Sequence, residues 1–404
     1  MCGDARRQQA GRGHDDERAL RRVRGRQGPA GVPLAPARSE ARLRILELAP
    51  FVAPIDERQV HIGGAQAILA DIARGLAARG HEVSLAAATG SYLPSVRVLD
   101  LGVDARTLRP AALLAQERAD EPAQHAAFGR ARRWLDEHEV DVAHAHAYDA
   151  PAFEALIGAR CRVVHTLHLP PVDRGVVAAA RRSTDARFTT VSRANAEAWQ
   201  AAGVDVDVVI PNGIDVSAVP FGDGGRFVVA AGRVSPEKGT DLAIEAARAA
   251  GMPLLIVGGI YDREFYDRAV APHVHEAPDW RLGDGVVGAM YVGPRPRSEL
   301  HRIFGAARAT CMPVRWEEPF GIVALESLAA GTPVVASARG GLRELVDDTV
   351  GVLVEEEAVL AFTLALHRTA SVERAACRRR AEEFTLAAML DGYEAVLAGE
   401  PRGV

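Results

Sequence analysis

Short apolar runs alternate with alanine-rich helical stretches from Leu43 almost to the end of the chain. The run 43–49 predicts a buried strand, and 65–79 predicts an amphipathic helix that Gly80 ends. Further strands are predicted at 82–88, 140–145, 162–167, 187–191 and 206–210. Strands that alternate with helices form right-handed βαβ units, so we predict an α/β fold with a parallel, doubly wound sheet.

The alternation restarts after a turn-rich segment at 220–225, Pro-Phe-Gly-Asp-Gly-Gly. Strands at 227–231 and 254–257, others around Met290, Ala309 and Val334, and a helix at 240–250 indicate a second α/β domain. The prediction is a leader over 1–41, an N-terminal domain over 42–219, a C-terminal domain over 226–384, and a last helix within 385–404 that can cross back to the N-terminal domain. Two such sheets facing each other leave a cleft at the carboxyl ends of their strands.

The leader differs in composition from the rest, because residues 1–44 hold 11 arginines and only 5 acidic residues. We expect it to be disordered. A basic arm for nucleic acid, or for peripheral association with a membrane, stays open as an alternative. The formal net charge of the whole chain is -5, which argues against a nucleic-acid binder that works by bulk charge.

Cysteine spacing and hydropathy indicate the compartment. The four cysteines are far apart in the sequence, which predicts a reduced, cytoplasmic protein without a disulfide framework. No apolar run approaches the roughly 18 residues of a membrane span. Three histidine pairs are candidate metal ligands, but no acid or cysteine cluster accompanies them, so no metal site is predicted. These pairs are His144 with His146, His165 with His168, and His273 with His275.

The strongest motif is Glu318-Pro-Phe-Gly-Ile-Val-Ala-Leu-Glu326. Pro319 is tolerated only in a first helical turn, which predicts that Glu318 stands where a helix begins and Glu326 further along it. The two carboxylates would be on the order of 10 Å apart, and each can accept two hydrogen bonds from a vicinal diol. The pair could therefore hold both ends of a nucleotide sugar. The alternative is that helix dipoles simply favour acids near N-termini.

Two further motifs suggest an anion site. Of the 48 basic residues only Lys238 is a lysine, and it follows Arg233 in Gly-Arg-Val-Ser-Pro-Glu-Lys-Gly, where a strand ends and a helix begins. A guanidinium and an ammonium beside a helix N-terminus can bind phosphate oxygens. Gly63 and Gly64 precede the first predicted helix and would let backbone approach a ligand closely, although a Gly-Gly pair is also a common turn.

In this order the motifs resemble the nucleotide-sugar-dependent, retaining glycosyltransferases of family 4, which have the GT-B fold. The similarity covers about residues 43–400 and includes Glu318 with Glu326, Arg233 with Lys238, and the Gly63-Gly64 loop. Further matching segments are 141–146, 166–168, 211–215 and 340–344. The resemblance implies two Rossmann-like domains facing across a cleft, a nucleoside-diphosphate sugar as donor, a hydroxyl acceptor and no cofactor.

The resemblance also implies roles for individual residues. Glu318 would contact donor sugar hydroxyls and Glu326 the ribose diol, while Arg233 and Lys238 hold the diphosphate and His146 lies near the reaction centre. The predicted catalytic residues are Arg233, Lys238, Glu318 and His146. The predicted donor-binding residues are Gly63, Gly64, Phe320, Gly321, Ile322 and Glu326. A sugar phosphorylase, a sugar-nucleotide epimerase and a catalytically silent nucleotide-sugar-binding subunit remain alternatives on the same scaffold.

Overall fold

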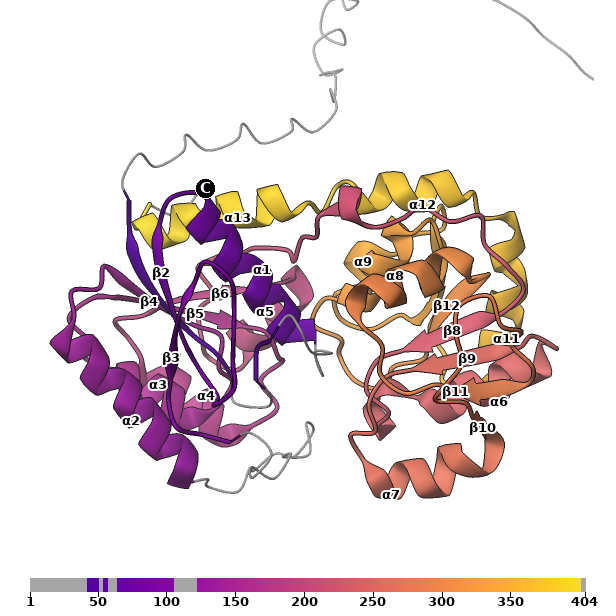
Figure 1. Ribbon diagram of the computed structural model, residues 1–404, viewed down its shortest axis with the longest axis horizontal. Helices are drawn as coiled ribbons and strands as arrows, with labels where there is room; N and C mark the ends of the chain where they lie inside the picture. Colours follow the sequence, from indigo (N-terminus) through magenta and orange to yellow (C-terminus); the bar gives the residue numbers. More distant parts are fainter. Residues whose placement is uncertain (1–41, 51–53, 57–63, 105–121, 401–404) are drawn as a thin grey trace, which may run out of the picture. The chain divides into compact units, whose positions relative to one another are not determined.

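The computed structural model describes residues 42–50, 54–56, 64–104 and 122–400 (Figure 1). The predicted leader and Gly63 lie outside these ranges. Within them the chain forms two parallel sheets, each flanked by helices, which confirms the α/β fold.

The first sheet has seven strands in the order β3-β2-β1-β4-β5-β6-β7. Their bounds are β1 (Arg44–Leu48), β2 (Glu82–Ala87), β3 (Arg97–Asp100), β4 (Val142–Ala145), β5 (Arg162–Leu167), β6 (Arg187–Thr190) and β7 (Val208–Val209). The second sheet repeats this plan in the order β10-β11-β9-β8-β12-β13-β14. Its bounds are β8 (Val228–Ala231), β9 (Leu254–Val257), β10 (His275–Glu276), β11 (Ala289–Tyr291), β12 (Ala309–Met312), β13 (Val334–Ser337) and β14 (Gly351–Val354).

In each sheet the strand order reverses beside the first strand. β1 pairs with β2 on one side and β4 on the other, and β8 pairs with β9 and β12 in the same way. Ligands in doubly wound folds bind at such a reversal, outside the carboxyl ends of the strands. The topology therefore marks two positions for a functional site, one between β1 and β4 and one between β8 and β12.

Helices cover both faces of the first sheet. In the described residues they are α1 (Gly64–Ala78), α2 (Pro122–Glu137), α3 (Ala150–Leu156), α4 (Arg174–Arg182), α5 (Arg193–Ala201) and, from the end of the chain, α13 (Leu386–Ala398). Ile68, Leu69 and Ile72 of α1 share one apolar cluster with Met389 and Tyr393 of α13. Figure 1 shows α13 running beside α1. The last helix thus belongs to the core under the first sheet.

The second sheet is covered in the same manner. Its α-helices are α6 (Thr240–Ala249), α7 (Arg263–Phe265), α8 (Arg297–Ala306), α9 (Ile322–Ala329), α10 (Leu342–Leu345), α11 (Val359–Arg368) and α12 (Arg374–Ala381). Short 3-10 or π turns are η2 (Val216–Ala218), η3 (Pro236–Lys238), η4 (Tyr266–Val270), η5 (Ala271–His273) and η6 (Thr369–Ser371). Helices α6 and α11 pack on one face, and α8, α9 and α12 contribute to the cluster on the other.

One local prediction is wrong. Pro319 does not lie in the first turn of a helix, because α9 begins only at Ile322, after Gly321 as N-cap. Gly321 has a φ of 93°, and a Cβ there would lie 2.6 Å from the Leu342 side chain, so only glycine fits. The chain turns at Gly321 rather than at the proline, and Glu318 precedes the helix by four positions.

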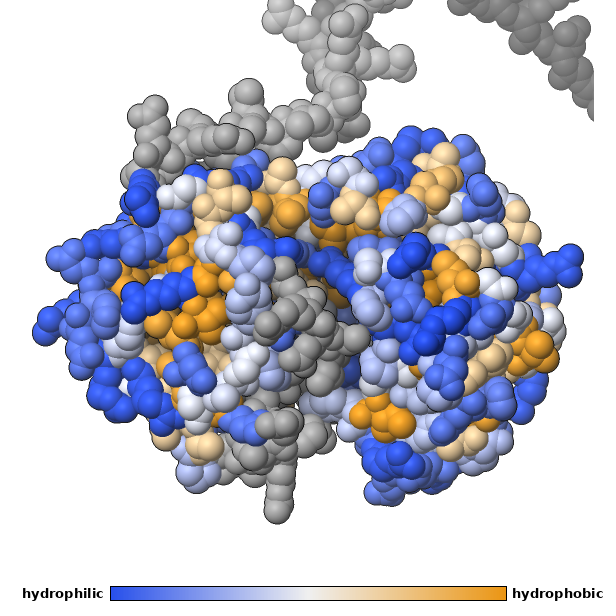
Figure 2. All heavy atoms as spheres, viewed as in Figure 1, coloured by the Kyte–Doolittle hydropathy of each residue, from blue (hydrophilic) through white to orange (hydrophobic). Residues whose placement is uncertain are grey.

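Hydrophilic residues cover much of the face shown in Figure 2, and hydrophobic residues gather in patches between them. Among the described residues no helix is both long and apolar enough to cross a bilayer. Cys161, Cys311 and Cys377 are free thiols.

Candidate active site

The loop after β8 presents two cations. It contains η3 (Pro236–Lys238) and ends at Gly239, whose φ of 66° is left-handed and whose missing Cβ leaves room for the Pro313 carbonyl. This tight passage fixes the backbone between Arg233 and Lys238. Both cations therefore stand at the carboxyl end of β8, beside β12, where the strand order reverses.

Lys238 forms an ion pair with Glu318 from the segment after β12. Its Nζ lies 2.7 Å from Glu318 Oε2, and the two side chains are only 20% and 11% exposed. Trp316 Nε1 donates to the same carboxylate oxygen at 2.9 Å, and the Trp316 ring lies under the ammonium at 4.8 Å. Because both side chains are mostly buried, the attraction between the two charges is stronger than it would be in water. Glu317, its neighbour, is exposed and accepts a bond from the Gly340 N–H.

Arg233 is the second cation of the loop. Its guanidinium lies over the Tyr261 ring at 4.8 Å and its Nη2 is 3.6 Å from Glu237 Oε1. Glu237 also accepts a bond from Ser235 Oγ at 2.7 Å. Stacking on Tyr261 and the long ion pair with Glu237 hold the Arg233 guanidinium in one orientation. A ligand anion could replace Glu237 as its partner.

Glu326, the other predicted acid, is held by a different cation. Arg297 donates from Nε to Glu326 Oε1 at 2.6 Å and from Nη1 to Asp71 Oδ2 of α1 at 2.6 Å. Burial alone would raise the pKa of Glu326, but the Arg297 charge outweighs it and the pKa is lowered. His301 Nε2 lies 3.4 Å from the same oxygen without hydrogen-bond geometry. Glu326 is thus an anion in a cluster that joins α1, α8 and α9.

The beginning of α9 brings several predicted donor-binding residues together. Ile322 is its first residue, and a Cβ on Gly64, the first residue of α1, would lie 2.7 Å from the Ile322 side chain. The first-turn N–H groups of α9 lack helical acceptors and lie at the positive end of its dipole. Phe320, by contrast, is 5% exposed and packs edge-on to Phe384, so its ring belongs to the core.

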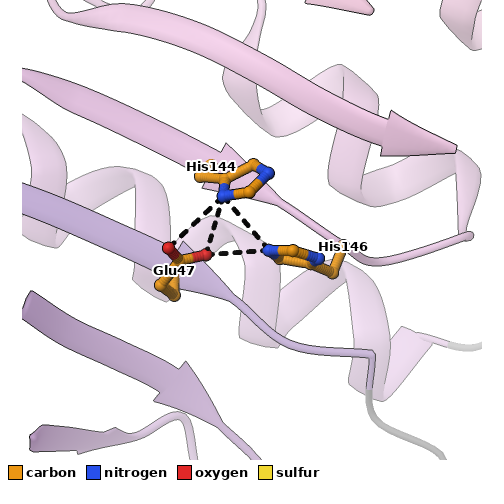
Figure 3. A group of neighbouring side chains, drawn as sticks. All are labelled: Glu47, His144 and His146. Carbon is orange, nitrogen blue, oxygen red and sulfur yellow. Dashed lines mark hydrogen bonds and ion pairs between the residues drawn. The ribbon is translucent and has the colours of Figure 1, made fainter. Parts of the chain in front are cut away.

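His146 lies at the other reversal, between β1 and β4, in a fully buried group with Glu47 and His144 (Figure 3). Its Nε2 is 2.8 Å from Glu47 Oε2, and Nδ1 of His144 is 3.0 Å from the same oxygen. The other nitrogen of each ring is also bonded. His146 Nδ1 lies 2.8 Å from His168 Nε2, and His144 Nε2 lies 2.8 Å from Thr166 Oγ1. Both ring nitrogens of His146 are therefore engaged inside the protein.

Burial and charge perturb this group strongly. Burial would raise the pKa of Glu47, but the neighbouring His144 and His146 lower it to about 2. Burial, reinforced by His144, lowers the pKa of His146 to about 4 against the opposing effect of Glu47. Burial likewise lowers the pKa of His165 to about 3 and that of His168 well below its usual value. At neutral pH the carboxylate is charged and these three imidazoles are neutral.

Glu47, His144 and His146 could also hold a metal ion, since their ligand atoms all lie within 4.8 Å of one another. Two histidines and a carboxylate are a familiar donor set for divalent metals. Each of these atoms, however, already has a hydrogen-bond partner within the group, so the side chains are satisfied without an ion.

Two family models match successive parts of the chain. "Glycosyltransferase Family 4" matches residues 62–218, and "Glycosyl transferases group 1" matches residues 215–384. A D-inositol 3-phosphate glycosyltransferase of Xylanimonas cellulosilytica is 30% identical, with 87% of this chain and 96% of the relative covered. The chain belongs to glycosyltransferase family 4. It is a glycosyltransferase.

A second relative and two solved structures are also similar to this chain. A phosphatidyl-myo-inositol mannosyltransferase of Mycolicibacterium smegmatis is 30% identical over 71% of this chain and 75% of its own. Sucrose-phosphate synthase of Thermosynechococcus elongatus superimposes with a TM-score of 0.72 at 20% identity, covering 89% of this chain and all of that one. Anabaena HepE, solved with UDP-glucose, gives 0.65 at 20% identity, with 89% and 100% covered. These structures establish the GT-B fold for this family 4 chain.

The structure adds residues that sequence reasoning missed. Trp316 and Arg297 contact the two predicted acids directly, and Asp71 shares Arg297. Trp316 precedes Glu318 by two positions in the sequence, and nothing in the sequence indicated its role. Glu47 could have been found from the sequence, because a single carboxylate inside an apolar strand needs a buried partner.

Proposed function

We propose that this glycosyltransferase transfers a hexosyl group from a nucleoside-diphosphate sugar to a hydroxyl acceptor, with retention of configuration and without an essential metal. The observation that carries the proposal is the convergence of Lys238 and Trp316 on Glu318 at the β8–β12 reversal. Cation and carboxylate neutralise each other there. A diphosphate would take over Lys238, and a sugar hydroxyl would donate to Glu318.

The reaction needs stabilisation of the charge that develops on the leaving diphosphate. Lys238, Arg233 and the first-turn N–H groups of α9 are oriented before substrate arrives, which is the arrangement that stabilises such charge most. The same groups are cations and dipoles fixed by the chain, so a metal is not required for this step. Retention would follow from attack of the acceptor hydroxyl on the face that the leaving group vacates, with the leaving oxygen taking the proton.

Glu326 would bind the ribose diol of the donor. Its pairing with Arg297 keeps it ionised, so that both oxygens remain acceptors. The relatives suggest which substrates to test first. One is named for D-inositol 3-phosphate, another for mannosyl transfer, and HepE was solved with UDP-glucose. Uridine and guanosine diphosphate sugars, with inositol phosphates as acceptors, form the first panel.

The deciding variant is Lys238→Ala. Loss of one transition-state donor should lower kcat by roughly 10²-fold or more while the protein stays folded. Thermal shift across nucleoside diphosphates and their sugars identifies the donor first, since a ligand of the folded state raises Tm. Transfer is then measured by product analysis, with and without EDTA.

Arg248→Ala is the matched control, because Arg248 is an exposed cation on the next helix, α6. Near-normal turnover in Lys238→Ala would refute the role of Lys238. Donor consumption without transfer to any acceptor would instead favour an epimerase or a hydrolase.

A further inference from the structure

Polar side chains replace apolar ones toward the carboxyl ends of neighbouring strands in the first sheet. Alternate residues of a strand share a face, so Glu47 follows Ile45 on the face that α1 and α13 cover, and His144 follows Val142. All the polar members of this face are at most 9% exposed. We call them the polar seam: Glu47, His144, His146, Thr166, His168 and Thr189.

The hydrogen bonds of the polar seam fix where its protons lie. Ionised Glu47 can only accept, so His146 donates its Nε2–H to Oε2 at 2.8 Å and His144 donates its Nδ1–H to Oε1 at 3.3 Å. His146 therefore carries its proton on Nε2, and its Nδ1 must accept. The available donor is His168 Nε2, at 2.8 Å. A proton on His168 Nε2 leaves the Nδ1 of the neutral His168 ring with a free lone pair.

The other branch of the polar seam is satisfied in the same way. Thr166 Oγ1 lies 2.8 Å from His144 Nε2 and 2.8 Å from Thr189 Oγ1, so it is hydrogen-bonded to both. This branch ends in threonine hydroxyls inside the sheet. The branch through His146 ends in a basic nitrogen instead, which gives the two branches different chemistry.

His168 is the outward end of that second branch. It follows the last residue of β5 and, at 9% exposed, is the most accessible member of the polar seam. Within the described part of the chain Nδ1 of His168 has no hydrogen-bond partner, and it is not among the buried atoms that lack one. Both nitrogens of His165 are buried and unbonded, because its ring is stacked on Phe153 at 4.3 Å. His165 on β5 and His168 just after it thus differ in their access to solvent.

We propose that Glu47 and His146 are positioning residues for His168, and that Nδ1 of His168 accepts a hydrogen bond from a substrate hydroxyl. The proposal rests on the proposed function and reassigns the substrate contact expected of His146. His146 has no nitrogen left for a ligand, whereas His168 stands at the carboxyl end of β5, the edge of the sheet where ligands of doubly wound folds bind. By accepting from His146, Glu47 fixes the tautomer of His146 directly and that of His168 through it.

The proton positions can be measured directly. In protein labelled with ¹⁵N-histidine, long-range ¹H–¹⁵N spectra distinguish the two neutral tautomers, and His146→Asn and His168→Asn spectra assign the signals. We expect both rings to be neutral and protonated at Nε2 at pH 7.5. A proton on Nδ1 of His168 would overturn the proposal. So would one equivalent of tightly bound metal that Glu47→Gln removes, because the ring nitrogens would then be ligands.

Kinetics test the function of the arrangement. Glu47→Gln and His168→Asn should each lower kcat by about 10²-fold, the scale of a lost general acid–base or orienting group. The double variant should lose little more than the worse single one, because the two residues act as a unit. Binding of the nucleoside diphosphate should stay within twofold of the wild type.

Glu394→Gln is the matched control, because Glu394 is another buried carboxylate near the first sheet, bonded to His81 at 2.8 Å. It should lower Tm as Glu47→Gln does and leave kcat unchanged. Normal kcat in His168→Asn, or strictly multiplicative losses in the double variant, would refute the proposal. If Lys238→Ala is inactive in that case, the proposed function survives and only this inference fails.

Discussion

The two sheets share one strand plan but differ in what occupies the point where the strand order reverses. Between β8 and β12 stand Lys238 and Glu318, opposite charges that retain some exposure and neutralise each other. Between β1 and β4 stands the polar seam, where Glu47 is fully buried and bonded only to imidazoles. The same topology can therefore hold two kinds of site. At the β8–β12 reversal a ligand could replace the partners of each charge, whereas at the β1–β4 reversal a hydrogen-bond network fixes the positions of protons.

The difference has a physical origin in the chemistry of the partners. The Lys238–Glu318 pair can be separated when a ligand supplies a new anion for the lysine and new hydrogen-bond donors for the carboxylate. A buried carboxylate cannot be left without its donors. We expect the first kind of site to determine what the enzyme binds and the second kind to determine how accurately a side chain is oriented.

The largest predicted effect concerns Arg297, which stabilises two nearly buried carboxylates at once, Asp71 and Glu326. Arg297→Ala leaves the buried Glu326 without its cation, while Asp71 keeps Arg74 at 2.6 Å, so the free energy of unfolding should fall by about 3 kcal/mol. Urea denaturation measures it. Arg302→Ala on the same helix is the control, because Arg302 is exposed and bonds only a carbonyl of its own helix. A loss below about 0.5 kcal/mol would mean that these ion pairs are as dispensable as ordinary surface pairs.

The second prediction concerns acid. His146 has a pKa of about 4 in the folded protein and about 6.5 when unfolded, so the unfolded chain binds the extra proton between these values. Stability should therefore fall as pH drops from 6.5 to 4, by on the order of 2 kcal/mol from this residue. Glu47, whose pKa is lowered from 4.5 to about 2 in the folded protein, extends the fall in stability below pH 4.5.

Urea unfolding at several pH values tests this. His146→Asn should reduce the slope between pH 6.5 and 4, where His165 and His168 also contribute, whereas His273→Asn, which removes an exposed histidine, should leave the curve unchanged. An unchanged slope in His146→Asn would show that the first region is not the acid-sensitive one, and the contrast between the two regions would lose its basis.

How far sequence predicts such sites depends on whether the chemistry is local. Strands 162–167 and 254–257 were predicted with their correct bounds, because continuous apolar runs between turns identify buried parallel strands. β3, β10 and β14 were not predicted. Exposed or half-exposed strands such as Arg97–Asp100 carry little apolar signal, whereas β14 was missed although it is apolar and largely buried. Pro319 misled the placement of α9, because the φ of Gly321, which sequence does not show, decides where that helix begins.

The candidate site follows the same rule. Lys238 and Glu318 were found because each belongs to a short motif, although they are far apart in the sequence. Arg297 and Glu47 were not, since their partners come from other elements and only the fold brings them together. Pairings across a fold depend on register and helix packing, which no local pattern records.

The smallest predicted effect concerns one hydrogen bond at the Lys238–Glu318 pair, which we call the exchangeable site because a ligand could replace each partner. Trp316→Phe removes the Nε1 donor to Glu318 and keeps an aromatic ring under Lys238. A single bond to a charged acceptor contributes about 1.5 kcal/mol or less, so kcat/KM should fall by about three- to tenfold. Trp280→Phe is a matched control, because Trp280 is buried and its Nε1 has no partner among the described residues. A 10²-fold loss of kcat/KM in Trp316→Phe would contradict the contrast between the two regions. Glu318 would then depend on its indole donor for its orientation, as His146 depends on Glu47.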